Sequence, residues 1–423
     1  MNYFTYNLLM YILSPMIWCY LGLRALRSSD YREGGWERLG IHKKVYPQAP
    51  LLIHCASVGE TKAAIPLIKS LLKEKVPLVV STTTPTGKAV VQAELGTSVE
   101  HCYLPIDWYG SCRRFVSKLK PKGVIIMETE LWPNLLGILE KRGIPVMLAN
   151  ARLSEKSKNK YLKRAAFSKV IIQKVSLIAA QYESDRANFK AIGAKTDALE
   201  VVGNIKFDLS VSEQLKAQQK HLLSQIQAGI DERPVWVAAS IHPGEFDAVL
   251  SAHRALLDKE PEALLVGIPR HPERFEEFAQ KVRQSGLNYC MRSKGEQVDN
   301  NTQVIVGDTM GEVMLFCGAA DLVFVGGSLV AKGGHNPLEA IACGKPVLVG
   351  PSIESFQDIC DALYHKKCLK YCSDLASLTL NIQNLMSDKD ARAKMSVLAQ
   401  QFMRENSGSA AKQIKLVKTL LAL

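Results

Sequence analysis

The sequence predicts an α/β protein made of two doubly wound domains, each built on a parallel sheet. Apolar runs of strand length alternate with helical patterns along most of the 423 residues. A polar stretch rich in Gln and Lys, from about residue 210 to 233, interrupts this alternation and could hold a connecting helix or linker. One hydrophobic core rarely serves so long a chain, at roughly 150 residues per domain, so we expect at least two domains.

The predicted strands of the first domain are mostly apolar, which is typical of parallel strands buried on both faces. They are the runs Leu51–Cys55, Leu78–Ser81, Gly123–Met127, Pro145–Ala149 and Leu177–Ala180. The segments 62–74 and 131–142 between them are long enough for crossover helices.

The alternation restarts after the polar stretch, and the pattern becomes helical after Asp374. The predicted strands of the second domain are 235–239, 263–268, 303–306, 322–325 and 346–349. If two such domains face one another, the carboxyl ends of their strands line a cleft between them. The predicted boundaries are 1–23 for a membrane anchor, 24–208 and 209–404 for the two domains, and 405–423 for a C-terminal helix.

The positive charge of the chain is confined to its first half. Up to Lys206 there are 30 Lys and Arg against 16 Asp and Glu, and after it 23 against 25. This asymmetry indicates an anionic partner for the first domain, whether nucleic acid, an acidic membrane surface or a phosphorylated substrate. None of the ten cysteines forms a Cys-x-x-Cys pair or a zinc-like set, which favours reduced thiols in the cytosol.

The first 23 residues carry no charged side chain and are rich in Leu, Ile, Met, Tyr and Trp. A membrane span needs about 20 apolar residues, and this run barely reaches that length. Basic residues follow it from Arg24 to Lys44, so the positive-inside rule predicts a tether that leaves the body of the protein in the cytoplasm. A buried amphipathic helix is the alternative.

The glycine loop from Gly326 to Gly350 is the most informative motif. It follows an apolar run and leads into a helix-like segment from Pro337 to Cys343, where backbone N–H groups and a helix start favour a phosphate or ribose phosphate. Glu339 in the first turn is a candidate acceptor for a hydroxyl. A tight structural turn is the alternative, because the loop matches neither common nucleotide-binding fingerprint.

Two loops of the first domain carry acids at predicted strand ends. In the turn 54–61, Glu60 is a candidate general base, and a helix-capping acid is the alternative. In the segment 127–134, Glu128 and Glu130 could bind sugar hydroxyls or orient Arg152, or could simply cap a helix and form an ion pair. Beyond them lies the densest basic cluster, formed by Lys156, Lys158, Lys160, Lys163, Arg164, Lys169 and Lys174. This cluster fits membrane phosphates or a phosphorylated acceptor, or a solvated helix face.

Three further loops follow predicted strands of the second domain. They contain Ser240 and His242, Arg270 with its neighbour His271, and Glu312. Arg270 can neutralise a phosphate permanently, and Glu312 with backbone N–H groups could hold ribose or phosphate. The only Asp-x-Asp, at 388–390, fits a helix N-cap better than a metal site, so we expect no metal and no cofactor.

Taken in order, these motifs closely resemble the Kdo transferase family over nearly the whole chain. They are 54–60, 127–134, 150–154, 203–208, 239–245, 269–274, 307–312 and 326–350. The resemblance implies a GT-B fold of two Rossmann-like halves with an N-terminal membrane-associated helix. It also implies an inverting transfer of 3-deoxy-D-manno-oct-2-ulosonic acid (Kdo) from CMP-Kdo to the lipid A precursor, lipid IVA, at the cytoplasmic face of the bacterial inner membrane. The partners would then be this donor, this acceptor and the anionic membrane surface, without nucleic acid.

The resemblance also implies roles for individual residues. Glu60 matches the family's general base. The matches to the CMP-binding positions are Pro269, Arg270, Met310, Gly311, Glu312, Asn336, Pro337, Leu338 and Glu339. We expect Ser57, Glu128, Glu130, Arg152, Ser240 and His242 to bind the acceptor or to support the residues that do.

Two other functional classes remain open from the sequence. One is a membrane-associated glycosyltransferase that uses a uridine nucleotide-sugar, and the other is a non-catalytic protein that binds a nucleotide or an anionic lipid. A dinucleotide dehydrogenase is disfavoured because its glycine fingerprint is missing.

Overall fold

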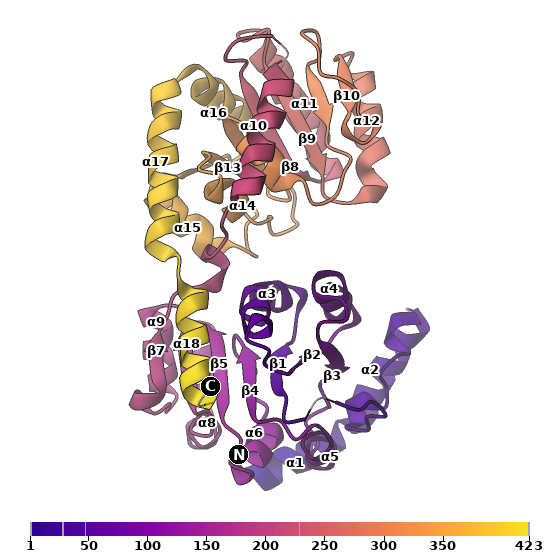
Figure 1. The fold of residues 1–423 in the computed structure, drawn as a ribbon, viewed down its shortest axis with the longest axis vertical. Helices are drawn as coiled ribbons and strands as arrows, with labels where there is room; N and C mark the ends of the chain where they lie inside the picture. Colours follow the sequence, from indigo (N-terminus) through magenta and orange to yellow (C-terminus); the bar gives the residue numbers. More distant parts are fainter. Residues whose placement is uncertain (1, 28, 47, 228, 422–423) are drawn as a thin grey trace. The chain divides into compact units, whose positions relative to one another are not determined.

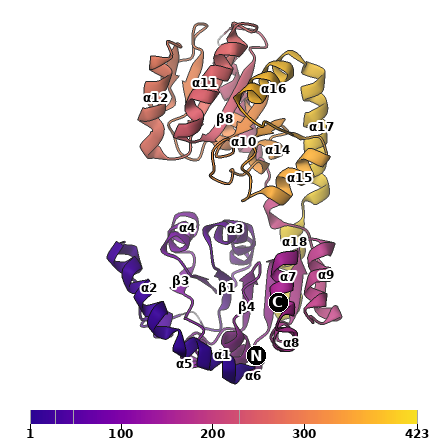
Figure 2. The ribbon, with the colours of Figure 1, turned by 180° about the vertical axis from the view of Figure 1, so that it is seen from behind.

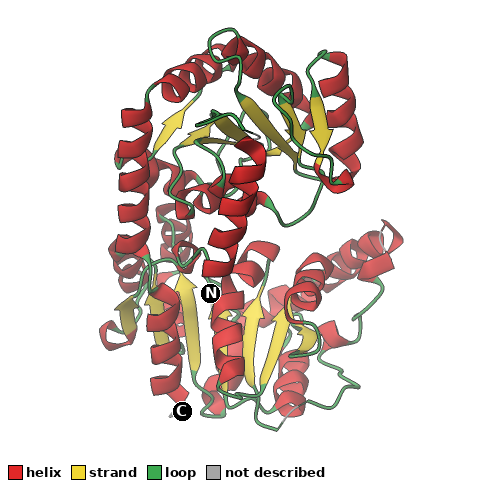
Figure 3. Cartoon of the chain, turned by 45° about the horizontal axis from the view of Figure 1, so that its top comes forward, coloured by secondary structure: helices red, strands yellow, loops and turns green. Residues whose placement is uncertain are grey.

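The computed structural model describes residues 2–27, 29–46, 48–227 and 229–421. The chain divides into two compact units, one made of Met1–Asp208 with Ser407–Leu423 and the other of Leu209–Asn406. In each unit helices lie on both faces of a central sheet, as Figure 3 shows with strands in yellow and helices in red. The prediction of two parallel-sheet α/β units is confirmed.

The first unit contains a seven-stranded sheet in which all neighbouring strands are parallel. Its strands are β1 Leu51–Cys55, β2 Leu78–Thr82, β3 Glu100–Tyr103, β4 Gly123–Met127, β5 Val146–Ala151, β6 Leu177–Ala180 and β7 Leu199–Val201. They lie in the order β3-β2-β1-β4-β5-β6-β7 (Figure 1). The order reverses between β1 and β4, so the carboxyl ends of these two strands flank the topological switch point, where doubly wound sheets bind ligands.

Two layers of helices bury the faces of this sheet. The helices are α3 Val58–Lys73, α4 Pro85–Leu95, α5 Tyr109–Leu119, α6 Pro133–Lys141, α7 Glu155–Leu162, α8 Ala165–Ile172, α9 Glu183–Ala191 and α18 Ser409–Leu421. One core contains Phe115 and Phe189 from the α5 and α9 side, and the other contains Ile68 and Val417 from α3 and α18. The end of the chain thus completes the core of the first unit.

The N-terminal apolar run forms two helices, α1 Tyr3–Ile12 and α2 Ser14–Arg27. Among the described residues, no single helix is long and apolar enough to cross a membrane, so the single membrane helix is not confirmed. Taken together, the two helices are long and apolar enough to cross a membrane, but they are bent by 46° relative to one another. One face of α1 is tied to the first unit, because the Tyr6 hydroxyl donates to Asp107 at 2.8 Å and the Tyr3 hydroxyl to the Pro133 carbonyl at 3.1 Å.

The second unit repeats the same plan with another seven-stranded parallel sheet. Its strands are β8 Val235–Ile241, β9 Leu264–Pro269, β10 Tyr289–Met291, β11 Val304–Val306, β12 Leu322–Val325, β13 Val347–Val349 and β14 Leu369–Tyr371. The order is β10-β11-β9-β8-β12-β13-β14, which places the switch point between β8 and β12.

The helices of the second unit again lie on both faces of the sheet. They are α10 Glu213–Gln227, α11 Pro243–Leu257, α12 Phe275–Gln284, α13 Val313–Gly318, α14 Leu338–Ala342, α15 Gln357–His365, α16 Leu375–Ser387 and α17 Lys389–Asn406. Figure 2 shows α11 and α12 in front of the sheet, where Phe246 and Phe278 join its core. Short 3-10 helices connect several elements, at Ser29–Tyr31, Glu37–Leu39, Thr196–Ala198, Ile205–Phe207, Pro272–Arg274 and Arg292–Lys294.

The predicted strands are all present, and the polar stretch before β8 forms the helix α10. The prediction missed β3, β7, β10 and β14, which are three or four residues long and lie at or next to the edges of the two sheets. Such strands need few apolar residues, so their signal is weak. Asp388 caps α17 as expected, because its side chain accepts a hydrogen bond from the Ala391 N–H at 2.8 Å.

Candidate active site

Each unit gathers chemically active side chains at its own switch point. In the first unit the loops after β1 and β4 carry Glu60, Glu128 and Glu130. In the second unit the loops after β8 and β12 carry His242 and His335. The sheet order brings these loops together although they are about 70 to 95 residues apart in the sequence.

Glu60 lies in the first turn of α3 and is only 9% exposed. Its Oε2 accepts a hydrogen bond from the Ala56 N–H at 2.8 Å, and its Oε1 accepts one from the Ser57 hydroxyl at 3.0 Å. The Ser57 hydroxyl oxygen in turn accepts from the Glu60 N–H at 3.2 Å. This is the geometry of a helix-capping acid, so the alternative role predicted for Glu60 is confirmed in part. The same contacts hold the carboxylate in one orientation, as a general base requires.

Burial raises the pKa of the Glu60 carboxyl to about 7. The hydrogen bond from Ala56 opposes this rise, and the negative charge of Glu128 reinforces it. Glu130 adds a smaller effect in the same direction. A carboxylate with a pKa near neutrality takes up a proton far better than an ordinary surface glutamate and is still ionised in part at neutral pH.

Glu128 and Glu130 form a half-buried acidic rim after β4. Glu128 has a positive φ of 54°, in the left-handed region, and its carboxylate lies 3.9 Å from the Lys206 ammonium. Burial raises the pKa of Glu130, while the Trp132 indole opposes that rise. Non-glycine residues with strained backbones often lie at functional sites. Arg152 is exposed, and its carbonyl accepts a hydrogen bond from Thr129.

A hollow of about 390 Å³ adjoins this rim in the first unit. It is lined largely by aromatic and apolar side chains, including Trp132, Tyr161 and Phe167, with Lys160 and Arg164 also in its lining. Four of the seven residues of the predicted basic cluster have a defined place. Lys158 pairs with Glu155 and Lys174 with Glu140, whereas Lys160 and Arg164 belong to the hollow.

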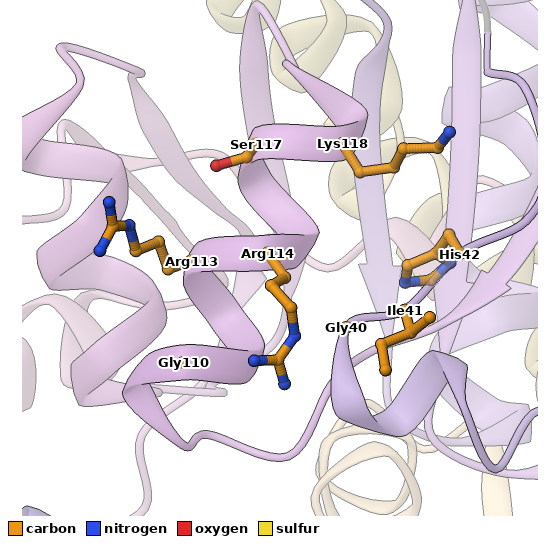
Figure 4. A pocket seen from close by; sticks show the side chains of 8 residues that line it. All are labelled: Gly40, Ile41, His42, Gly110, Arg113, Arg114, Ser117 and Lys118. Atoms are coloured by element: carbon orange, nitrogen blue, oxygen red, sulfur yellow. The ribbon is translucent and has the colours of Figure 1, made fainter.

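A second hollow of the first unit, of about 630 Å³, lies beside α5. Figure 4 shows Arg114 and Lys118 reaching from α5 toward the segment 40–42. Arg114 donates two hydrogen bonds to the Leu39 carbonyl, at 3.1 and 2.6 Å, and so fixes this segment. Arg113 also lines the hollow, which is therefore rich in cations.

In the second unit, Glu245 organises the glycine loop. Its side chain is fully buried and accepts hydrogen bonds from the N–H groups of Gly327 at 2.7 Å, Ser328 at 3.0 Å and Leu329 at 2.9 Å. It also accepts from the His242 N–H at 2.9 Å. Because Glu245 uses so many backbone donors, these N–H groups do not face a ligand. The expectation that the start of this loop would present its N–H groups to a phosphate is wrong at these positions.

The imidazoles of His242 and His335 meet above this loop. Their Nε2 atoms are 2.9 Å apart and the rings are stacked at 13°. His271 packs edge-on against His242, with ring centroids 5.7 Å apart. Ser240, which precedes this group, has a positive φ of 58° where β8 shifts register against β9. Arg270 begins the loop that carries His271, and its N–H donates to the Ile241 carbonyl at 3.0 Å.

Glu312 is already paired, since Arg292 donates to both of its carboxylate oxygens, at 2.8 and 3.1 Å. The Thr309 hydroxyl also donates to it. The hydrogen bonds from Arg292 are the main reason that the pKa of Glu312 is lowered. A ligand at this loop would thus meet mainly backbone atoms around Gly311, whose φ of 84° favours glycine, and the exposed Met310.

The segment Asn336–Glu339 leads into the helix α14. The Asn336 side chain accepts a hydrogen bond from the Leu338 N–H at 3.1 Å, and Pro337 and Leu338 are buried. Glu339 is half-buried in the first turn, as expected. The helix has five residues, so its dipole is small and the side chains carry most of any ligand recognition here.

Several residues of these sites were not singled out from the sequence. Glu245, His335 and Lys206 lie within the motifs 239–245, 326–350 and 203–208, but the sequence predicts no role for them because only the fold brings them to their partners. The pattern serine-x-glycine-glutamate at Glu60 recurs as histidine-x-glycine-glutamate at Glu245, and this similarity could have found Glu245. All ten cysteines are free, and among the described residues no group of three or more His, Cys, Asp or Glu could hold a metal ion.

Comparison with known proteins identifies both halves of the chain. Residues 33–209 match the family model for 3-deoxy-D-manno-octulosonic-acid transferase (kdotransferase), and residues 240–402 match glycosyl transferases group 1. A 3-deoxy-D-manno-octulosonic acid transferase of Haemophilus influenzae is 39% identical over 99% of this chain and 98% of its own length. One of Bordetella pertussis is 33% identical over 99% of both chains.

A solved glycosyltransferase of Rickettsia africae shows the same fold, with a TM-score of 0.55 over 89% of this chain and 99% of its own, at 10% identity. The resemblance found in the motifs therefore extends to the full sequence, and both units have the α/β architecture of GT-B enzymes. The chain belongs to the 3-deoxy-D-manno-octulosonic acid transferase family, a family of glycosyltransferases.

Proposed function

We propose that this protein transfers Kdo from CMP-Kdo to the lipid A precursor, lipid IVA, in lipopolysaccharide biosynthesis. Its family membership supports the Kdo transfer. The observation that carries the mechanism is the buried, oriented carboxylate of Glu60, whose pKa is raised to about 7 at the switch point of the first unit.

In this mechanism Glu60 is the general base. It removes the proton from an acceptor sugar hydroxyl while that oxygen forms a bond to the anomeric carbon of Kdo. The bond from this carbon to the phosphate oxygen breaks, and CMP leaves with the electron pair as an anion. Attack from the face opposite CMP inverts the anomeric configuration, so one base suffices. Ala56 and Ser57 are positioning residues that hold the carboxylate for this step.

The donor binds in the second unit. Arg270 neutralises the phosphate. Pro269 ends β9 directly before Arg270, and Met310 and Gly311 lie in the loop after β11. Glu339 accepts from a ribose hydroxyl at the start of α14, while Glu312 fixes its own loop through Arg292. Because Arg270 carries a permanent charge at a strand end, it can stabilise the departing phosphate without a metal ion. Metal independence is therefore part of the proposal, and loss of activity in EDTA that Mg²⁺ restores would contradict it.

The acceptor binds in the first unit. The hollow beside Glu130 combines aromatic walls with Lys160 and Arg164, which suits a glycolipid that carries both acyl chains and phosphates. Glu128 and Glu130 follow β4, and Arg152 follows the neighbouring strand β5, so these side chains would contact or orient its sugar hydroxyls. Ser240 and His242 belong to the donor unit rather than to this acceptor site.

We further propose that α1 and α2 hold the protein on the cytoplasmic face of the inner membrane. The helices expose large apolar side chains, among them Phe4, Ile12, Met16 and Leu23. The cation-rich hollow of Figure 4 suits anionic headgroups. The double variant Ile12→Glu, Met16→Glu should reduce co-sedimentation with vesicles that contain anionic lipid by about tenfold, at unchanged CMP binding. Unaltered co-sedimentation would contradict membrane attachment through these helices.

The function is tested by mass spectrometry of the lipid made by purified protein from lipid IVA and CMP-Kdo formed in situ. We expect a product heavier by one or more Kdo units. Titration with CMP, UMP and UDP gives the donor class independently. A preference for a uridine nucleotide would overturn the donor assignment, and CMP binding without any lipid product would favour a non-catalytic protein.

A further inference from the structure

Five cationic or titratable groups gather at the switch point of the second unit. They come from the loops after β8, β9 and β12, and they are His242, Arg270, His271, Lys332 and His335. We call them the basic cluster of the second unit. The contact between the two Nε2 atoms and the edge-on packing of His271 hold the three imidazoles together. The positive charge of Arg270 is close enough to help lower the pKa of both His242 and His335.

This cluster has little negative charge to balance it. Glu245, whose negative charge acts on the His242 imidazole, is fully buried and already accepts four backbone N–H groups. Among the described residues, neither Arg270 nor Lys332 forms an ion pair with a carboxylate. Burial and the neighbouring positive charge of Arg270 lower the pKa of His335 to about 4, so a further positive charge on this imidazole is unfavourable. Groups arranged in this way bind anions.

The shape of the backbone adds to this observation. His335 lies directly against Gly327, where a Cβ atom would come within 2.9 Å of its ring. Gly327 has a φ of 68°, and its carbonyl accepts from the Gly334 N–H at 2.9 Å. The glycine loop therefore folds back so that His335 reaches His242 in the loop after β8. The histidine contact spans the two strands that form the switch point, where ligands of doubly wound sheets bind.

The chemistry of an activated ulosonic acid requires two neighbouring anion sites. In such a donor the carboxyl group is bonded to the anomeric carbon itself, and the phosphate oxygen is bonded to the same carbon. The carboxylate and the phosphate must therefore lie side by side when the donor binds. Nucleotide donors that carry an aldose have a hydrogen atom in place of this carboxylate, so they need only one anion site.

We propose that His242, His271 and His335 form a carboxylate subsite beside Arg270 and thereby select an ulosonic acid as the sugar of the donor. This inference rests on the proposed function. Arg270 takes the phosphate and the imidazole N–H groups take the carboxylate. A neutral imidazole carries one N–H, and the hydrogen bond between His242 and His335 uses the N–H of the ring that donates. The ring that accepts and His271 therefore each keep one N–H for the ligand.

The test measures affinity for three ligands with the full-length protein and no acceptor: CMP, CMP-Kdo, and CMP-Kdo with its carboxylate replaced by a carboxamide. The native protein should bind the acid at least about tenfold more tightly than the amide, as expected for charge-assisted hydrogen bonds. His335→Asn and, separately, His271→Asn should reduce this ratio to below about threefold. Both variants should keep the affinity for CMP within about twofold.

His221→Asn is the matched control, because it makes the same change at an exposed residue of α10 in the same unit. It should leave all three affinities unchanged. If His335→Asn lowers the affinity for CMP as much as the affinity for CMP-Kdo, the histidines bind the phosphate or only stabilise the loops, and the proposal is wrong. His271 is exposed, so its variant remains informative if His335→Asn does not fold.

The proposal would also be wrong if the native protein bound CMP-Kdo and its carboxamide with nearly equal affinity. It would be wrong as well if the preference for the acid were unchanged in both His335→Asn and His271→Asn. Failure of the proposed function gives a different result, because the native protein would then prefer UMP or UDP to CMP, or would not bind CMP-Kdo at all.

Discussion

The two units place a glutamate at the equivalent position of the fold and use it differently. Glu60 and Glu245 are each the third residue of the helix after the first strand of their unit. Each accepts a hydrogen bond from the backbone N–H of a residue just before that helix, Ala56 or His242. Glu245 then takes three more N–H groups from the loop of a neighbouring strand. In addition to the Ala56 N–H, the Glu60 carboxylate accepts a hydrogen bond from the Ser57 hydroxyl, and it lies beside two other acids.

This comparison shows how one fold supports two kinds of chemistry. A carboxylate saturated with backbone donors is a structural clamp, whereas one with few donors and acidic neighbours takes up a proton readily. The surroundings follow the same division, since the first switch point collects acids and the second collects Arg270, Lys332 and histidines. The sheet order determines where each site lies, and the side chains at the strand ends determine the chemistry of that site.

Arg270 tests the basic half of the comparison through the affinity of the second unit for CMP. Arg270→Gln removes the permanent charge beside the histidines, and we expect the Kd for CMP to rise about 100-fold, as for the loss of a desolvated charge-assisted contact. Isothermal titration measures this change, and Arg274→Gln on the same loop is the control. A change below threefold would mean that the phosphate binds elsewhere.

Glu245 tests whether the buried glutamate is a clamp. In Glu245→Gln an amide N–H₂ group faces backbone donors that the carboxylate satisfied, so unfolding of the second unit should become easier by about 3 kcal/mol. Chemical denaturation monitored by CD or by the fluorescence of the buried Trp236 measures this loss. Glu60→Gln should not destabilise the first unit at pH 8, because it removes a carboxylate whose ionisation burial makes unfavourable. Equal losses in both variants would refute the distinction between the two glutamates.

The pH dependence of the reaction tests the acidic residues of the first unit, and the change in activity that we expect is smaller. The folded-state pKa of Glu60 lies above its ordinary value, so the neutral form is favoured and the base is lost as pH falls below about 7. We expect kcat/KM to decline there with one protonation. Glu128→Gln removes a negative neighbour and should move this decline to lower pH, by up to about one unit. An unchanged profile would mean that the observed protonation belongs to another group.

Much of this arrangement could be predicted from the sequence because its patterns are local. The apolar runs predicted the inner strands of both sheets, and the acids and Arg270 were found at strand ends. The partners of Glu60, Glu245 and His335 are set by sheet order or by backbone geometry, which no local pattern encodes. The bend between α1 and α2 was likewise missed, since composition gives the length of an apolar run but not its path.

The central claim is that the first unit supplies the base and the second holds the donor. Glu60→Gln tests it most directly when donor affinity and turnover are measured on the same preparation. The account predicts a Kd for CMP-Kdo within about twofold of the native value and turnover reduced by a factor of about 10²–10⁴, as for the loss of a general base. Turnover within tenfold of the native rate, at unchanged donor affinity, would contradict it.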